Sequence, residues 1–241
     1  MIDSMNVSGA STCTGGVYKD VKISGAGKVE GDLECETLHC SGAGKVTGTI
    51  KSRDTHISGS FKCEGKADVG NAKCSGSAKF ESDVRAEEFK SSGVTKIIGS
   101  LRASAVRCSG SLKTEGDIEA DEVKVSGNIN VGGLINAEKI VMNLSGESRA
   151  SEVGGSEISI NMTNDGETSV TIFGISVFRH RKNIFECKTV EGDNVSIDYV
   201  TSDTVRGAKV FIGKNSNISR VEYTESCEIE NGAKVGECVK V

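Results

Sequence analysis

The side chains in this chain that could do chemistry are histidines, cysteines and lysines, and many of them recur at a fixed spacing. The chain has 3 His and 9 Cys. His39 and His56 are separated by an interval of seventeen positions, and Cys40, Cys74 and Cys108 by twice that interval. Imidazoles and thiolates bind zinc and serve as catalytic groups. Whether these can act together depends on the elements that carry them.

A lysine also recurs at the same interval. The series is Lys28, Lys45, Lys62, Lys79, Lys96 and Lys113, and it ends at Asn130. Stacked in register, these lysines would form a ladder of positive charge that could bind lipid headgroups, polysaccharide or nucleic acid. Glutamates follow two positions after four of them, at Glu30, Glu64, Glu81 and Glu115. The same face could therefore be a neutralised surface.

All of these spacings belong to one internal repeat, which begins with a Ser-Gly pair. The pair occurs, always at this interval, at Ser24, Ser41, Ser58, Ser75, Ser92, Ser109 and Ser126. We number each unit from its serine, which is position 1. Ser8-Gly9 and Ser145-Gly146 fit with slightly different spacings, so the repeat spans residues 8 to 146. A period this short and rich in Gly is typical of a β-solenoid, because helical repeats need more than about 30 residues.

The repeat also predicts which positions face the core. Positions 6, 10, 12 and 15 are mostly apolar or small, and polar residues lie between them. Such alternation indicates three short strands per coil, and we expect the glycines to permit the bends between them. The sequence therefore predicts an all-β fold, a parallel β-helix with about 17 residues per coil and a triangular cross-section.

Composition agrees with a thin core and restricts the possible functions. The chain of 241 residues has 30 Gly, no Pro, no Trp and 4% aromatic residues. Central strands exclude Pro, so its absence suits a solenoid. The net charge of −5 disfavours nucleic-acid binding. We see neither a signal peptide nor an apolar stretch as long as a membrane helix, and expect a cytoplasmic protein with free thiols.

Placed on the repeat, the chemically capable residues become structural. Six cysteines fall in apolar columns: Cys13 and Cys63 at position 6, Cys35 at position 12, and Cys40, Cys74 and Cys108 at position 17. We expect them to pack as small hydrophobes. The rings of His39 and His56 should be stacked neighbours, without a third ligand for a metal. His180 lies in a basic cluster, FRHRKNIF, which could touch an acidic membrane surface or form a turn.

The chain divides into three parts by pattern. Residues 1–146 are the regular β-helix. Residues 147–184 are irregular, and the alternating runs that flank Asn-Asp-Gly predict a β-hairpin, which either projects from the rod or divides two rods. Residues 185–241 resume as a second, looser β-helical segment. Valines there recur at every fifth position, and Cys187, Cys227 and Cys238 lie among apolar neighbours.

Two stretches resemble a known family. Repeated units such as SGAGKVEGDL, together with the C-terminal stretch TVRGAKVFIGKNSNISRVEYTESCEIENGAKVGECVKV, resemble longer bactofilins of Gram-positive bacteria. The resemblance implies a right-handed triangular β-helix that polymerises end to end without nucleotide and scaffolds other proteins at the cell envelope. Bactofilins commonly have Pro-rich tails and an N-terminal membrane-binding motif. This chain departs from both features, since it has no Pro and only MIDSMN precedes the repeat.

The sequence thus favours a non-enzymatic scaffold that stacks on copies of itself. The end coils of a solenoid leave backbone groups unpaired, and neither end encodes an obvious cap. We expect no catalytic residue, cofactor or metal, and no nucleic-acid partner. Expected partners are further copies and envelope-associated client proteins. The location is the cytoplasm, with contact to the inner face of the membrane left open.

Two other functions remain open at this stage. The first is a carbohydrate- or envelope-binding module that uses the lysine ladder as its binding face. The second is an enzyme of the lyase or acyltransferase type, as other β-helices are. That enzyme would need a base on a protruding loop, and successive units here have no insertion that could carry one.

Overall fold

The structure is a computed structural model that describes residues 3–163, 168–172, 175–179 and 184–241. His180 and the basic residues around it lie outside these ranges. Within them, the regular elements are strands, of which 22 form one sheet and 2 form another. Among the described residues there is no helix that could cross a membrane.

The strands of the regular repeat are β1 (Met5–Val7), β2 (Ser11–Ile23), β3 (Ala26–Cys40), β4 (Ala43–Val46), β5 (Ile50–Ile57), β6 (Ser60–Cys63), β7 (Ala67–Cys74), β8 (Ser77–Phe80), β9 (Val84–Ser91), β10 (Val94–Ile97), β11 (Leu101–Cys108), β12 (Ser111–Thr114), β13 (Ile118–Val125), β14 (Asn128–Val131) and β15 (Leu134–Leu144). Those that follow are β16 (Ser148–Arg149), β17 (Glu152–Gly154), β18 (Glu157–Met162), β19 (Thr168–Ile172), β20 (Ile175–Arg179), β21 (Phe185–Ile197), β22 (Val200–Ile212), β23 (Asn217–Ile229) and β24 (Lys234–Lys240).

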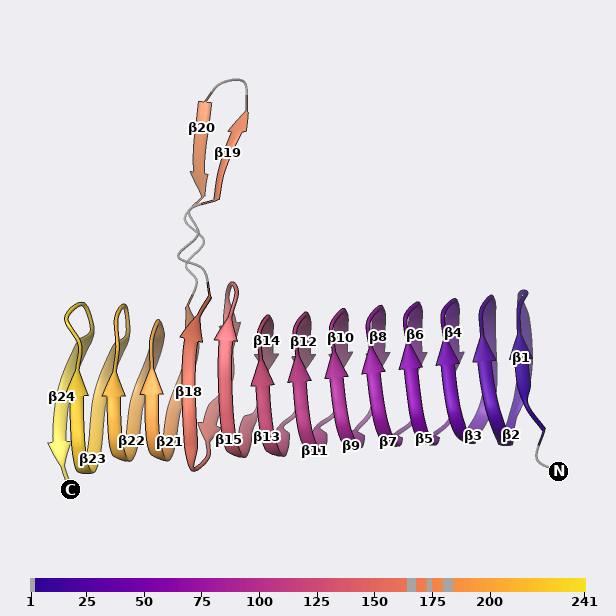
Figure 1. Cartoon of the computed structure of the whole chain (residues 1–241), viewed down its shortest axis with the longest axis horizontal. Helices are drawn as coiled ribbons and strands as arrows, with labels where there is room; N and C mark the ends of the chain where they lie inside the picture. Colours follow the sequence, from indigo (N-terminus) through magenta and orange to yellow (C-terminus); the bar gives the residue numbers. More distant parts are fainter. Residues whose placement is uncertain (1–2, 164–167, 173–174, 180–183) are drawn as a thin grey trace.

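Each strand of the large sheet pairs in parallel with strands one coil away. Val29 pairs with Val46, Val46 with Cys63 and Cys63 with Phe80, so each position of the repeat stacks on itself. The result is a β-solenoid of about 13 turns with about 17 residues per coil. Figure 1 shows a straight rod with the N-terminus at one end and the C-terminus at the other. The predicted all-β parallel fold is confirmed.

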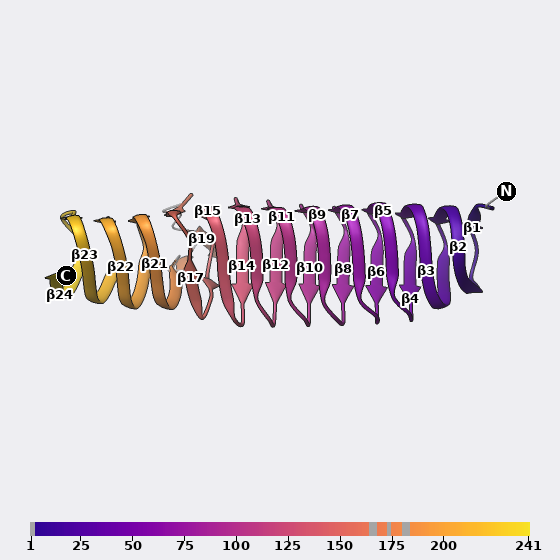
Figure 2. The same cartoon turned by 90° about the horizontal axis from the view of Figure 1, so that it is seen from below.

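Three faces make up each coil. The first face, positions 3–6, is a short strand such as β4, and the longer strand β5 bends to form the other two faces, positions 10–12 and 14–17. In β5 the alternation of buried and exposed residues breaks at Arg53 and Asp54, where the chain turns a corner. Figure 2 shows the short strands alternating with these bent strands along the rod. Two inward positions per face give a narrow core.

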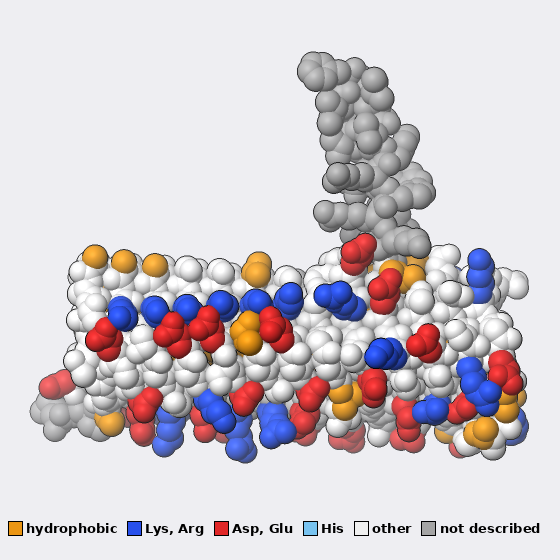
Figure 3. All heavy atoms as spheres, turned by 180° about the vertical axis from the view of Figure 1, so that it is seen from behind, with side chains coloured by type: hydrophobic (Ala, Val, Ile, Leu, Met, Phe, Trp, Pro, Cys, Tyr) orange, Lys and Arg blue, Asp and Glu red, His pale blue; other side chains and the backbone are white. Residues whose placement is uncertain are grey.

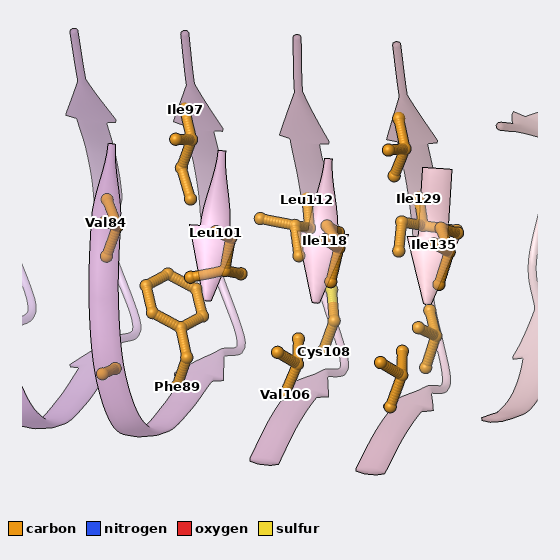
Figure 4. Packing of buried hydrophobic residues seen from close by; sticks show 14 of the residues in the cluster. Val84, Phe89, Ile97, Leu101, Val106, Cys108, Leu112, Ile118, Ile129 and Ile135 are labelled. Atoms are coloured by element: carbon orange, nitrogen blue, oxygen red, sulfur yellow. The ribbon is translucent and has the colours of Figure 1, made fainter. Parts of the chain in front are cut away.

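The core contains one column that the sequence pattern did not reveal. Position 4 also faces inward, and its members from the third regular unit onward are Phe61, Ala78, Thr95, Leu112 and Ile129, all at most 2% exposed. Figure 4 shows Leu112 and Ile129 directed into the interior with the residues of the other columns. The sequence does not show position 4 as an apolar column, because Gly27 and Gly44 occupy it in the first two units. There a Cβ on Gly44 would lie 2.7 Å from Cys40 Sγ.

The glycine of each Ser-Gly pair is required by close approach and not by the bend itself. No such glycine of the regular units is among the described residues with positive φ. A Cβ on Gly59, Gly76 or Gly93 would lie 2.0 to 2.1 Å from the carbonyl oxygen of the equivalent glycine one coil below. Any side chain would therefore force adjacent coils apart. We expected these glycines to permit the bends, but the structure shows that the close approach of adjacent coils requires them.

The strands β16–β18 and β21–β24 continue the same rod. The strand β18 pairs in parallel with β15 on one side and β21 on the other. The Asn-Asp-Gly predicted as a hairpin turn lies outside the described residues, and β18 does not form the hairpin strand that the sequence suggested before it. The antiparallel pair is instead β19 with β20, a separate two-stranded sheet drawn beside the rod in Figure 1.

The coil between β21 and β22 is shorter than the others, which explains the valines at every fifth position. Phe185 pairs with Val200, Val190 with Val205 and Val195 with Val210, so the interval between coils here is fifteen positions. Three faces of five residues then place every fifth side chain inward. Val190, Val195, Val200, Val205 and Val210 are all at most 2% exposed.

Candidate functional site

The six predicted lysines form a continuous ladder on the first face. They pair in register from Lys28 to Lys113, and the column continues through Asn130 to Arg149. Figure 3 shows this row of positive side chains along the rod, with a row of carboxylates beside it. Side chains alternate between the two sides of a strand. The lysines at position 5 therefore point outward, because positions 4 and 6 point inward.

Glutamates at position 7 neutralise much of the ladder. Glu64 Oε1 lies 2.8 Å from Lys45 Nζ and 3.0 Å from Lys62 Nζ. Glu81 bridges the next step, with distances of 3.1 Å to Lys62 and 2.8 Å to Lys79. Lysines of successive coils are thus joined by a shared carboxylate, which relieves their repulsion. Lys28–Glu30 and Lys96–Glu115 are further pairs.

Protonation behaviour reflects this bridging. Hydrogen bonds from Lys45 and Lys62 lower the pKa of Glu64 to about 2. The pKa values of Glu30, Glu81 and Glu115 are also lowered, each mainly by a hydrogen bond from a ladder lysine. Hydrogen bonds to Glu64 and Glu81 raise the pKa of Lys62. The ladder from Lys28 to Lys96 therefore stays charged and internally paired over the ordinary pH range.

The two histidines of the regular repeat lie on the third face. His39 and His56 are paired in register, and their ring centroids are 6.2 Å apart with the planes inclined at 40°. They are neighbours as predicted, although tilted. Within the described ranges, no group of three or more His, Cys, Asp or Glu side chains could hold a metal ion.

The first six cysteines lie where the repeat placed them, and none forms a disulfide. Cys40, Cys63, Cys74 and Cys108 are at most 2% exposed. Burial raises the pKa of Cys63 and Cys74 to about 12 and that of Cys108 to about 11. These thiols are inert core residues.

Cys238 differs from the prediction that it lies among apolar neighbours. It is exposed, because no described strand pairs with the outer edge of β24. Its Sγ lies 3.4 Å from Cys227 Sγ in the preceding coil. Sequence alone did not reveal this pair, since the two cysteines occupy different faces. The strand register indicates the pair: Cys227 is the partner of Val210 and Cys238 the partner of Val221, so both cysteine side chains point inward.

A surface groove of about 620 Å³ crosses the third face near β15, β18, β21 and β22. Outward residues in register, Val141, Ser159, Ser196 and Phe211, form its floor. Lys139 at its edge is paired with Glu157 at 2.9 Å. The groove thus combines small and apolar side chains with ion pairs, and it lacks the arrangement of base and nucleophile that hydrolysis would need.

The two ends of the rod expose strand edges. At the N-terminal end, β1 covers only the third face of β2, through Met5↔Val21 to Val7↔Ile23. At the C-terminal end, β24 covers only the first two faces of β23, from Asn217↔Lys234 to Tyr223↔Lys240. Among the described residues no element pairs with the outer edge of β24.

The direction of the backbone hydrogen bonds shows what the C-terminal edge offers. At position 10 of the regular coils, the N–H donates to the coil that follows, as Leu33 does to Thr49 O and Ile50 to Lys66 O. Cys238 occupies this position in the last coil, because Val205, Val221 and Cys238 are successive partners. Its N–H therefore points out of the end of the rod. Such unpaired donors are a template for another strand.

Comparison with known proteins agrees with this geometry. Residues 3–102 match the family model described as "Bactofilin: Polymer-forming cytoskeletal". No curated protein and no solved structure was found to match the chain. The matched residues are the coils from β1 into β11, which carry the ladder up to Lys96. In these residues the chain is therefore similar to the bactofilin family of polymer-forming cytoskeletal proteins.

Proposed function

We propose that this protein is a non-enzymatic cytoskeletal scaffold that stacks end to end into filaments without nucleotide. The observation that carries the proposal is the pair of unpaired strand edges at the ends of a regular parallel solenoid. Every internal coil exchanges backbone hydrogen bonds with the coils on both sides, whereas the edges of β1, β2, β23 and β24 do so on one side only. A second copy can satisfy these groups.

The shapes of the two ends also fit one another. The chain begins on the third face with β1 and ends on the second face with β24. A copy placed on the outer edge of β24 would therefore continue the spiral on the next face. The core columns would continue too, since the inward residue Cys238, which is exposed at the end of the rod, would become interior.

The proposed location is the cytoplasm, with envelope-associated proteins as clients of the filament. The lysine ladder is the proposed surface for such contacts. Lys113 supports it, because among the described residues no carboxylate lies within salt-bridge distance of its ammonium group. Asn130 follows in the column and adds no negative charge.

Strand-edge variants test the assembly. Val235→Pro with Lys240→Pro removes two N–H groups that, by the alternation of the strand, point away from β23. We expect sedimentation velocity to show single rods for this variant and assemblies for Val235→Ala with Lys240→Ala, which keeps both donors. Equal assembly of the two variants would contradict stacking through this edge.

A further inference from the structure

Two cysteines meet at the C-terminal end of the rod. Cys227 lies on the third face of β23 and Cys238 on the second face of β24. The Cys238 thiol donates a hydrogen bond to Cys227 Sγ, with 3.4 Å between the sulfur atoms. Cys227 is half-buried and Cys238 is exposed. One sulfur is therefore open to solvent while the other lies directly behind it.

This pair differs from the other cysteines of the chain. In the regular repeat, thiols at position 17 alternate with other residues, so Cys40 and Cys74 are separated by Ile57 and buried. At the end of the rod, each cysteine replaces a valine of its column, since Cys227 follows Val210 and Cys238 follows Val221. Core packing alone does not require a thiol at either position, because valine fills the same position in the coil before it.

We propose that Cys227 and Cys238 are a redox-active dithiol, which hydrogen peroxide or another hydroperoxide converts to an intramolecular disulfide that joins the last two coils. The proposal goes beyond the assembly proposed above. The thiol chemistry does not depend on that function, whereas any effect of the bond on filaments rests on it.

The reaction proceeds in two balanced steps. The exposed Cys238 sulfur, as a thiolate, attacks one peroxide oxygen, so the O–O bond breaks, a sulfenic acid forms and water leaves after protonation. The Cys227 sulfur then attacks the sulfenic sulfur. An S–S bond forms, the S–O bond breaks, and the hydroxyl leaves as water with the Cys227 proton. Two thiols thus lose two electrons and two protons, and one peroxide becomes two waters.

The geometry assigns the two roles. Cys238 is the accessible thiol, so it reacts first. Cys227 acts second, because burial and the neighbouring Cys238 raise its pKa to about 12 and keep it a thiol until the attack. The bond would hold β24 on β23 at the edge that receives the next copy. It would therefore restrict fraying of the terminal coil.

Peptide mass spectrometry of the full chain tests the proposal. After brief treatment with hydrogen peroxide and alkylation of remaining thiols, we expect a cross-linked peptide pair that contains Cys227 and Cys238 and has lost two hydrogen atoms. Hydrogen exchange in β24 should slow several-fold and recover after reduction. The buried cysteines Cys63 and Cys74 should remain unmodified under the same conditions.

Two variants serve as controls. In Cys227→Val, which restores the valine of the column, Cys238 should stop at the sulfenic acid and react with dimedone. In Cys238→Val no oxidation should occur at Cys227. Disulfides between two copies, oxidation of Cys238 without the cross-link in the unaltered chain, or no reaction at all would overturn the proposal. A stacked copy would cover Cys238, so all readouts are taken on single rods at low protein concentration, where failure of the thiol chemistry cannot be confused with failure of assembly.

Discussion

Single residues matter in this fold because each inward side chain meets the same position of the next coil. At position 6, Thr114 lies between Ile97 and Val131. It is 1% exposed, and among the described side chains its Oγ1 is a buried polar atom without a hydrogen-bond partner. At position 4, by contrast, Thr95 pairs its hydroxyl with Ser91 Oγ at 2.9 Å. The two threonines therefore contribute to stability with opposite signs.

Thr114→Val should raise the free energy of unfolding by about 1 kcal/mol, because it removes an unpaired buried hydroxyl without changing the side-chain volume. Thr95→Val is the matched control and should lower it by about 1 kcal/mol, since it leaves the buried Ser91 hydroxyl without its partner. Urea unfolding followed by circular dichroism measures both. Loss of stability in Thr114→Val would show that its hydroxyl is satisfied after all.

At the scale of elements, the corners and the outward columns set the spacing between coils. The Ser-Gly corner brings backbone atoms of adjacent coils into contact, and the shared carboxylates of the ladder tie neighbouring strands. Both effects repeat along the rod. A change at one unit therefore alters two interfaces, one with the coil before it and one with the coil after it.

Gly76→Ala should lower the free energy of unfolding by about 1–3 kcal/mol, because the new Cβ would lie 2.1 Å from the Gly59 carbonyl oxygen. Gly9→Ala is the control, since a Cβ there has nothing within 4 Å. Thermal unfolding of the two variants provides the comparison. Equal melting temperatures would mean that the coils can separate at the corner without cost.

Acidification should weaken the ladder in a defined range of pH. The folded pKa of Glu64 is lowered to about 2, whereas its ordinary value is 4.5. Its contribution to stability is therefore complete above pH 4.5 and is lost as the pH falls through the folded value. NMR titration should find Glu64 titrating near pH 2, and Lys62→Gln should raise that midpoint. An ordinary midpoint in the unaltered chain would argue against the bridge.

Much of the fold could be predicted from the sequence, because a strict period transfers one unit's pattern to all others. The register of the ladder and the burial of Cys63 or Cys74 followed from it. Position 4 and the Cys227–Cys238 pair did not. The apolar character of position 4 is not visible in the units where glycine replaces an apolar residue. The Cys227–Cys238 pair depends on a contact between two faces, which an alignment of the repeat units does not contain. The parallel pairing of β18 was missed because the insertion that follows it interrupts the period.

At the scale of the whole molecule, the rod combines a regular body with two ends at which the described strands have unpaired edges. The body is paired throughout its described strands, whereas the ends expose backbone donors and acceptors. This division predicts that changes on the sides of the rod leave assembly intact and changes at the ends do not. Envelope clients would then bind the sides while copies of the chain occupy the ends.

The ladder provides the corresponding test on the side of the rod. The triple variant Lys62→Gln, Lys79→Gln and Lys96→Gln should assemble like the unaltered protein, because these side chains point away from both ends. Sedimentation velocity at matched salt measures it. Loss of assembly in this variant would place the contact on the side of the rod and would favour lateral over end-to-end association.

Electron microscopy of the purified full chain at near-physiological salt shows whether the rods stack end to end. We expect thin filaments one rod wide, with an axial repeat of about 60 Å, given about 13 turns spaced about 4.8 Å apart. They should form without added nucleotide. Single rods of that length at high protein concentration, with no filaments, would show that the chain does not stack end to end.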